Sequence, residues 1–400
     1  MIKELRTHFN KNFTAEKYQT LLHAIEHLSP KTLGFRIAET PLFISEDFKN
    51  KALETCEYII DFINNDEFKN ITQKSLPTEI QIPGCDNHPQ MMVFDFGICK
   101  NEEGEIQPQL IEMQGFPSVI GLQFFLDEFY TSIFEISKSV DSYLNGYNQT
   151  TYVQLLKEII IGTAKLENVV LLEHQPLQQK TLIDFICIQQ LIGIETICIK
   201  DLRCEDSMLY YYKGEKKVMI ERIFNRVVFD DLTTNDWNTI IDLRKKYNVT
   251  WINHPEWYYR ISKYCLPFLH HPNIPKSYFL HEVMQPLPLE TYVLKPLFSY
   301  AGMGVIIDVK QENIDSIKDP ENWILQKKVN YAPIIPTPDE PAKAEWRIFY
   351  FWKNGEMKPV AIHNLARLSK EDMIGTRYNA HKEWVGGTIA YIEKKLTKLN

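Results

Sequence analysis

The sequence lacks several features that would each assign a broad class of protein. It has no apolar run near the roughly 18 residues of a membrane-spanning helix, and its first residues, MIKELRTHFNKNFTAEKY, have no apolar signal-peptide core. Positive charge is not in excess either, since the formal net charge is -8, whereas nucleic-acid binders usually carry a basic face. We therefore expect a cytoplasmic protein with no membrane and no nucleic-acid partner.

Cysteine is scarce and irregularly spaced. The seven cysteines are odd in number and include no C-x-x-C pair, which excludes a disulfide framework and a zinc knuckle and favours a reducing compartment. Hydrophobic residues make up 44% and aromatic residues 12% of the chain, which is ample for a packed core. A length of 400 residues predicts two or three modules.

Apolar spacing predicts alternating helices and strands along the chain. Helical spacing occurs at residues 14–28, 46–64, 123–144, 177–192 and 255–269. Strands are expected at residues 91–98, 109–114, 169–172, 195–199, 291–295, 304–308, 323–329 and 345–351. The strands at 91–98 and 109–114 flank a turn and form a hairpin, across which Asp95 and Glu112 are expected to face each other. The segment 168–200 reads as a βαβ-like unit of an α/β module.

A strand that ends in Lys295 leads into the loop Ser299-Tyr300-Ala301-Gly302-Met303-Gly304. Glycines let backbone N–H groups approach phosphate oxygens closely, and a lysine at the end of the strand adds a positive charge to the same phosphates. The loop is neither a Walker A loop nor a G-x-G-x-x-G fingerprint. Taken alone, the motif also fits an ordinary hairpin with a surface lysine.

The order of motifs in residues 251–400 resembles the ATP-grasp superfamily. A lysine on a helix (Lys263) precedes an Ile-Pro segment (Ile274-Pro275), then come the lysine strand, the glycine loop and a strand reading Gln326-Lys327-Lys328-Val329. The resemblance implies that these positions bind ATP. The ATP-binding residues that it implies are Lys263, Lys295, Ser299, Gly302, Gly304, Gln326, Lys327 and Val329.

A metal-binding E-x-N strand, which the superfamily usually has near its C-terminus, is missing from that part of the sequence. The best match lies in the N-terminal hairpin, where Leu110-Ile111-Glu112-Met113-Gln114-Gly115-Phe116-Pro117-Ser118 follows Phe94-Asp95-Phe96. This arrangement resembles the circularly permuted ATP-grasp ligases of the glutathionylspermidine synthetase and glutathione synthetase type. It implies Mg²⁺ ligation by Asp95, Glu112 and Gln114, with Gln114 standing where the pattern has Asn. Carboxylate and amide oxygens suit Mg²⁺, although exposed acids on a hairpin are common without a metal.

Other polar positions complete the resemblance. Arg367, in Arg367-Leu368-Ser369, and Arg347 are expected to neutralise charge on a transferred phosphoryl group, and surface ion pairing is the alternative for both. Asn379 and Arg226 are implied substrate contacts. Arg226 suits a substrate carboxylate because a guanidinium matches a carboxylate with two hydrogen bonds. For His174, at the carboxyl end of a strand, a structural role is favoured over a catalytic one.

These expectations give an α+β fold: a circularly permuted ATP-grasp core with antiparallel sheets around an ATP cleft, and a smaller α/β pre-ATP-grasp module. Residues 1–150 would hold the N-terminal helices and the metal hairpin, residues 151–250 the substrate module, and residues 251–400 the nucleotide-binding region. The implied function is an ATP- and Mg²⁺-dependent ligase that joins a small carboxylate to an amine through an acyl-phosphate, on an amino-acid or peptide-like substrate. A phosphotransferase on the same scaffold and a non-catalytic ATP-binding protein are the alternatives.

Overall fold

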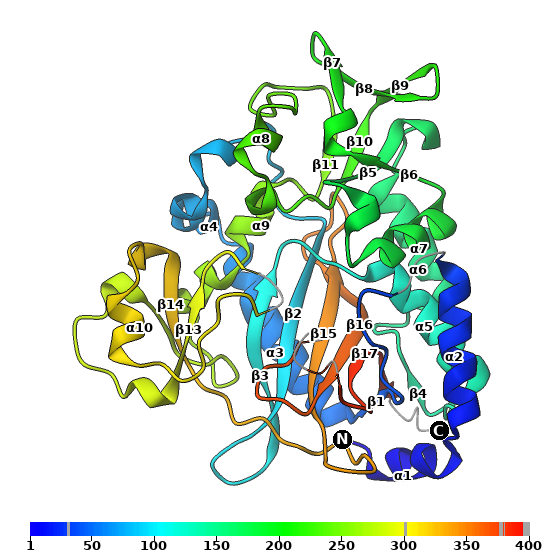
Figure 1. Cartoon of the computed structure of the whole chain (residues 1–400), viewed down its shortest axis with the longest axis vertical. Helices are drawn as coiled ribbons and strands as arrows, with labels where there is room; N and C mark the ends of the chain where they lie inside the picture. The colour runs from blue at the N-terminus through cyan, green and yellow to red at the C-terminus, as the bar shows by residue number, and fades with distance from the viewer. Residues whose placement is uncertain (30–32, 300–301, 376–378, 380, 395–400) are drawn as a thin grey trace.

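The computed structural model describes residues 1–29, 33–299, 302–375, 379 and 381–394. Its centre is a five-stranded antiparallel sheet in the order β17-β16-β15-β2-β3, which stands upright in Figure 1. The strands are β2 (Met91–Lys100), β3 (Ile106–Gln114), β15 (Lys343–Phe351), β16 (Val360–Ser369) and β17 (Gly386–Thr388). Together with the helices around it, this sheet gives the chain a mixed α+β architecture.

Segments from the two ends of the chain meet in this sheet. The N-terminal hairpin β2–β3 lies beside the C-terminal strand β15, with Arg347 opposite Asp95 and Asp95 opposite Glu112. This confirms the prediction that residues 91–118 share an antiparallel sheet with residues 345–367. The pairing closes a long loop, which chain entropy tolerates because the cost of closure grows only slowly with loop length.

The sheet is covered on both faces, so its central strands are nearly continuously apolar. All of β2 except Lys100 is buried. Because side chains alternate between faces, Phe94 and Phe96 pack into the core on the side of α3 (Glu46–Ile63), while Met91 and Val93 enter a second core. Helix α3 turns an apolar stripe toward this sheet, which is the pattern of a surface helix packed on a core.

A second, parallel sheet occupies the upper part of Figure 1. Its order is β11-β10-β5-β6, made by β5 (Val169–Glu173), β6 (Glu195–Cys198), β10 (Arg222–Asn225) and β11 (Thr250–Ile252). Helices α6 (Gln149–Ile160) and α7 (Leu182–Ile192) cover one face, and a capping box at Asn148 starts α6, a device that stabilises a helix by about 1 kcal/mol. Glu173 and Arg226 follow strands of this sheet at their carboxyl ends, the edge where open α/β sheets bind ligands.

A third unit, at the left of Figure 1, is a small antiparallel sheet in the order β12-β14-β13. Its elements are β12 (Ser277–Phe279), β13 (Tyr292–Pro296), β14 (Trp323–Lys327) and α10 (Gln311–Asp315). The expected strand at 304–308 is wrong, since only Ile306 makes a bridge, to Leu294. The reason is local: Gly302 and Gly304 both have positive φ values of 70° and 74°, so the chain turns there instead of extending.

The remaining elements frame these three sheets. A three-stranded sheet in the order β1-β18-β4 and another in the order β7-β8-β9 lie at the periphery. These strands are β1 (Leu42–Ile44), β4 (Val140–Asp141), β7 (Arg203–Glu205), β8 (Met208–Lys213), β9 (Lys216–Ile220) and β18 (Ala390–Glu393). The helices are α1 (Lys3–Asn12), α2 (Ala15–Leu28), α4 (Phe68–Ile71), α5 (Ile120–Ile133), α8 (Thr234–Trp237), α9 (Glu256–Arg260) and the 3₁₀ helix η7 (Lys263–Phe268).

Three expected helices differ from the bounds that the sequence predicted, and the first of them, expected at 177–192, is α7, which begins only at Leu182. Helix α5 ends at Ile133, not at residue 144, and residues 140–141 form β4. The expected helix at 255–269 is divided into α9 and η7, which contains Pro267. None of the helices in the described part of the chain combines the length and apolar composition needed to span a membrane.

Candidate active site

One face of the central sheet changes from apolar to charged along its length. Period-two alternation places Arg347 on β15 and Asp95 on β2 beside each other, on the face that carries Val93 and Phe349 farther along these strands. Glu112 on β3 is the next residue in the same row. In the neighbouring row Arg367 on β16 pairs with Glu345 on β15. Four adjacent strands therefore contribute charged groups to one surface.

Asp95 is the buried centre of this surface. Arg347 donates two hydrogen bonds of 2.6 Å to its two carboxylate oxygens, and Arg367 donates a third of 2.7 Å. Burial alone raises the pKa of Asp95, but the two arginines outweigh it, so the pKa lies below its usual value. The carboxylate is fully buried and is a counter-ion for both guanidinium groups. Its metal ligation stays a prediction, and it requires the release of at least one arginine contact.

A cavity of about 470 Å³ opens at this charged surface, between the central sheet and the sheet β12-β14-β13. Its lining includes Glu112 and seven of the eight residues expected to bind ATP. Those seven are Lys263, Lys295, Ser299, Gly302, Gln326, Lys327 and Val329. The eighth, Gly304, does not line it; a side chain there would meet Pro296 at 2.9 Å, so its role is to close the loop. Tyr300 and Ala301 of the same loop lie outside the described residues.

Two buried lysines enter this first cavity. Lys295 donates to Gln326 Oε1 at 2.5 Å and to the Ile111 carbonyl at 3.4 Å, and Lys263 donates to the Ser299 carbonyl at 2.6 Å. Burial lowers the pKa of both, and that of Lys295 falls to about 8, helped by the positive charge of Lys263. Glu112 Oε2 lies 3.9 Å from Lys263 Nζ, and Glu112 and Glu345 are the negative charges that act on Lys295. The pair of lysines is thus only partly neutralised by the protein.

Glu345 also faces the first cavity, although it was not among the predicted site residues. Arg367 lies 3.0 Å from Glu345 Oε2, and the Tyr331 hydroxyl donates to Oε1 at 2.5 Å. Gly97 explains how the tyrosine reaches the sheet, because a Cβ at Gly97 would lie 2.7 Å from the Tyr331 ring. Burial raises the pKa of Glu345 and Arg367 opposes the shift. The alternation of Glu345 and Arg347 on one strand was the sequence signal for this acid.

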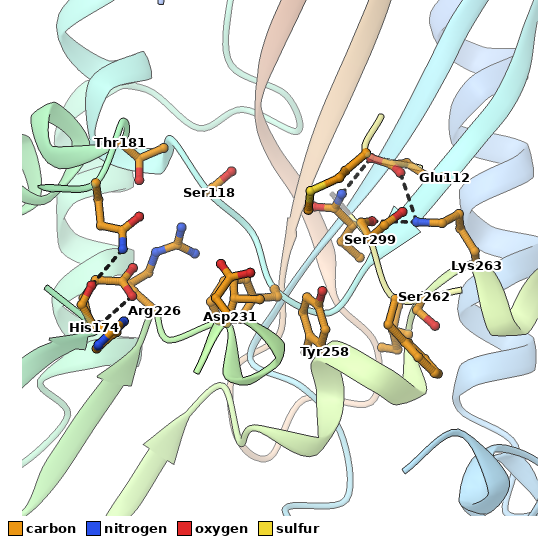
Figure 2. A pocket seen from close by; sticks show the side chains of 18 of the residues that line it. Glu112, Ser118, His174, Thr181, Arg226, Asp231, Tyr258, Ser262, Lys263 and Ser299 are labelled. Atoms are coloured by element: carbon orange, nitrogen blue, oxygen red, sulfur yellow. Dashed lines mark hydrogen bonds and ion pairs between the residues drawn. The ribbon is translucent and has the colours of Figure 1, made fainter. Parts of the chain in front are cut away.

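A second cavity, of about 480 Å³, lies between the central sheet and the parallel sheet. Figure 2 shows Arg226 and His174 on one side of it and Glu112, Lys263 and Ser299 on the other, with Asp231 and Tyr258 between. Gln114, whose amide nitrogen donates to Glu112 Oε1 at 2.7 Å, is part of the lining, and so is Ser118.

The Arg226 side of this cavity carries opposite charges. Arg226 is buried over the Phe116 ring, donates to the Pro117 carbonyl, and keeps its Nε without a hydrogen-bond partner. Burial raises the pKa of neighbouring Glu173 to about 7, against the influence of Arg226. His174 Nε2 lies 3.3 Å from Asp236 Oδ1, so this carboxylate helps to orient the imidazole ring. These groups offer a cation, an ionisable carboxyl group and an imidazole to one ligand.

The two cavities share a wall. Glu112, Lys263 and Ser299 line both of them, so a group placed at this wall is accessible from either side. Arg347 lies behind it, with Nη2 3.8 Å from Glu112 Oε1, and lines neither cavity. Asn379 is also remote from both: it is buried and binds Ser369 and the backbone of Lys370. Asn379 therefore positions the chain before Asp372, whereas Arg367 lines the first cavity directly.

Comparisons with known proteins show a fold and no closer relationship. No protein-family model and no curated protein sequence matches the chain. Among solved structures, the chain is similar to the apo form of a glutathione synthetase-like effector from Globodera pallida, with a TM-score of 0.58 and 10% sequence identity. The match covers 94% of this chain and 96% of the effector. The chain therefore has a glutathione synthetase-like fold over nearly its whole length.

Proposed function

We propose that this chain is an ATP- and Mg²⁺-dependent ligase that joins a carboxylate to an amine through an acyl-phosphate. The observation that carries the proposal is the shared wall of Glu112, Lys263 and Ser299 between two cavities. A reaction between a nucleotide and a second substrate requires both to reach one point from separate sites, because oriented contact supplies much of the catalysis. The fold shared with the glutathione synthetase-like effector supports the same assignment.

The first cavity suits ATP with Mg²⁺. Gln326 Nε2 is buried there without a hydrogen-bond partner, so it is available to donate to a bound ligand. Lys263 and Lys295 provide charge for phosphates, and Glu112 with Glu345 offers the carboxylate oxygens that Mg²⁺ prefers. Bound ATP-Mg²⁺ would supply the phosphoryl group that activates the carboxylate. Such a site would match the circularly permuted ATP-grasp arrangement that the sequence resembles.

In the second cavity the chain would hold the acceptor. Arg226 has an unused buried donor and would bind one anionic end of the substrate, while the reacting carboxylate would lie at the shared wall. Lys263 and Arg367 would neutralise charge that builds up on the oxygens during transfer. Arg347 donates two hydrogen bonds to the Asp95 carboxylate and so keeps Asp95 and the sheet in register. Arg347 is therefore a positioning residue in this scheme.

The test is a screen for ADP release over pairs of small carboxylates and amines, amino acids and short peptides first. The expected result is ADP release that requires both partners, and a product with a new amide bond. Glu112→Gln should abolish turnover while Glu102→Gln, in the exposed turn of the same hairpin, should not. ADP release with a stable phosphorylated product and no need for an amine would identify a phosphotransferase. ATP binding without turnover on any pair would identify a non-catalytic protein.

A further inference from the structure

A second group of ligand-type side chains lies apart from both cavities, where the loop before β2 meets the start of α9. Cys85, His254 and Glu256 each place one donor atom within 4.8 Å of the others. We propose that they bind one Zn²⁺ ion as a structural staple. Thiolate, imidazole and carboxylate together are a zinc donor set, whereas Mg²⁺ and Ca²⁺ take shells of oxygen atoms. None of the three residues lines either cavity, so this site is separate from the Mg²⁺ site proposed above.

Each donor has capacity left for a metal. His254 is 1% exposed, and its buried Nε2 makes no hydrogen bond of good geometry, although the backbone carbonyls of Ile82 and Pro83 lie close to the ring. Its Nδ1 accepts only a long hydrogen bond, of 3.3 Å, from the Glu256 backbone N–H. An unpaired buried polar atom costs free energy, which a metal or an ordered partner would recover.

The carboxylate and the thiol are likewise available. Arg260 donates two hydrogen bonds to Glu256 Oε2, at 2.9 Å and 2.8 Å, and leaves Oε1 outside this ion pair. The Cys85 thiol has only a weak contact, 3.6 Å, to the Asp86 carbonyl. Cys85 is half-buried and the other two ligands are buried, which gives the ion an entry path through the loop. A solvent molecule would complete the four-coordinate shell.

The framework around the three ligands is held in place on both sides. Asn253 accepts hydrogen bonds from the backbones of Gln90 and Met91 at 2.8 Å and 2.9 Å, which ties β11 to the start of β2. Lys69 donates to the Asp86 carbonyl at 2.7 Å and Arg260 to the Lys69 carbonyl at 2.9 Å. Donors of a tetrahedral zinc shell lie about 3.3–3.8 Å apart, given bonds of about 2.0–2.3 Å. Side-chain rotations that move the donor atoms by about 1 Å would therefore bring them to these separations without moving the backbone.

The charge around the three ligands depends on the state of Cys85. Arg260 neutralises much of Glu256, and the Lys69 ammonium lies beside the carbonyls of Cys85 and Asp86, so a bound cation needs the additional negative charge of a Cys85 thiolate. The site becomes favourable only when Cys85 gives up its proton, since the thiolate is the ligand and metal binding releases protons. A bound ion would join the loop before β2 to α9, and α9 leads directly into η7 with Lys263. The staple would thus support the active-site frame without taking part in the reaction.

The experiment uses the full-length protein, stripped with a chelator and kept reduced, and titrates it with Co²⁺ and with Zn²⁺ alone. We expect one ion per chain, a thiolate-to-cobalt charge-transfer band, and d–d bands of a four-coordinate ion that Zn²⁺ displaces. X-ray absorption of the zinc form should show one sulfur at about 2.3 Å and nitrogen or oxygen neighbours at about 2.0–2.1 Å. Absence of the charge-transfer band in the wild-type protein would overturn the proposal.

Three variants assign the ligands. Cys85→Ser should lose the charge-transfer band and weaken Zn²⁺ binding at least tenfold, and Glu256→Gln should keep the band but weaken binding. Cys204→Ser changes an exposed thiol elsewhere and is the matched control, which should bind like the wild type. Equal zinc affinity in Cys85→Ser and Cys204→Ser would show adventitious binding and refute the site. Circular dichroism confirms that each variant is folded, and none of these readouts depends on ligase activity.

Discussion

The buried ion pairs of Asp95 provide the sharpest test of how the central sheet is held together. In Asp95→Asn the side chain keeps its shape but loses its charge, and Arg347 and Arg367 lose the partner of three hydrogen bonds of 2.6–2.7 Å. Removing one partner of a buried ion pair typically costs about 3–5 kcal/mol, because the remaining charge stays buried without compensation. Since whole domains are stable by about 5–15 kcal/mol, the variant should lose a large part of its stability.

The measurement is the urea unfolding midpoint, followed by tryptophan fluorescence, for the wild type, Asp95→Asn and a surface control. Asp61→Asn removes the partner of Lys358, whose side chain is 47% exposed while that of Asp61 is 64% exposed, and should cost less than about 1 kcal/mol. The folded-state pKa of Asp95 lies below its usual value, so its contribution is complete above about pH 4 and declines as the pH falls. The wild type should therefore lose more stability on acidification than Asp95→Asn. A loss in Asp95→Asn no larger than in the control would refute the reasoning.

Three further predictions concern the cavities. Lys295→Ala should weaken ATP-Mg²⁺ binding at least tenfold in calorimetric titration, about 1.4 kcal/mol or more, with unchanged circular dichroism; wild-type affinity would place the phosphates elsewhere. Burial lowers the pKa of Lys295 to about 8, so its charge is present below that pH and lost above it. The affinity of the wild type for ATP should therefore fall as the pH rises through about 8. An affinity that does not change with pH would contradict this prediction. Arg226→Gln should raise the KM of the carboxylate substrate about tenfold or more, as loss of a charged hydrogen bond predicts, and leave the KM of ATP unchanged; equal changes in both would argue for a general structural effect.

The sequence predicted those parts of the site that are marked by local strand alternation or by the order of motifs along the chain. Strand alternation in the segment around Asp95 and Glu112 indicated the hairpin, and the need for carboxylates near Lys295 indicated that the hairpin joins the C-terminal strands. Both expectations rest on periodicity and on chemical requirement, which a single sequence displays. The structure confirms the shared sheet and places Glu112 and Lys295 at one cavity.

The features of the site that the sequence did not predict depend on side-chain contacts between residues far apart in the sequence. Nothing near Asp95 in the sequence shows that two arginines more than 250 residues away occupy its oxygens. Glu345 alternates with Arg347 on one strand, which the sequence displays, but its contacts with Arg367 and Tyr331 come from other segments of the chain and are not visible in the sequence. The strand expected at 304–308 is wrong because the chain turns at Gly302 and Gly304, and only Ile306 makes a bridge. Tertiary contacts decide such points, and apolar spacing does not report them.

The balance of charge around the shared wall argues for an anionic ligand in its own right. The cations Arg347, Arg367, Lys263 and Lys295 outnumber the carboxylates Asp95, Glu112 and Glu345, in a chain whose formal net charge is -8. Asp95 is bound by the two arginines and Glu345 is paired with Arg367, so the lysines are only partly neutralised by Glu112 and Glu345, and burial pushes the pKa of Lys295 down. Keeping an incompletely paired lysine buried is unfavourable in the empty protein. Phosphate oxygens in the first cavity would remove that cost and restore the lysine charge, which is the physical reason for expecting nucleotide affinity to depend on Lys295 and on pH together.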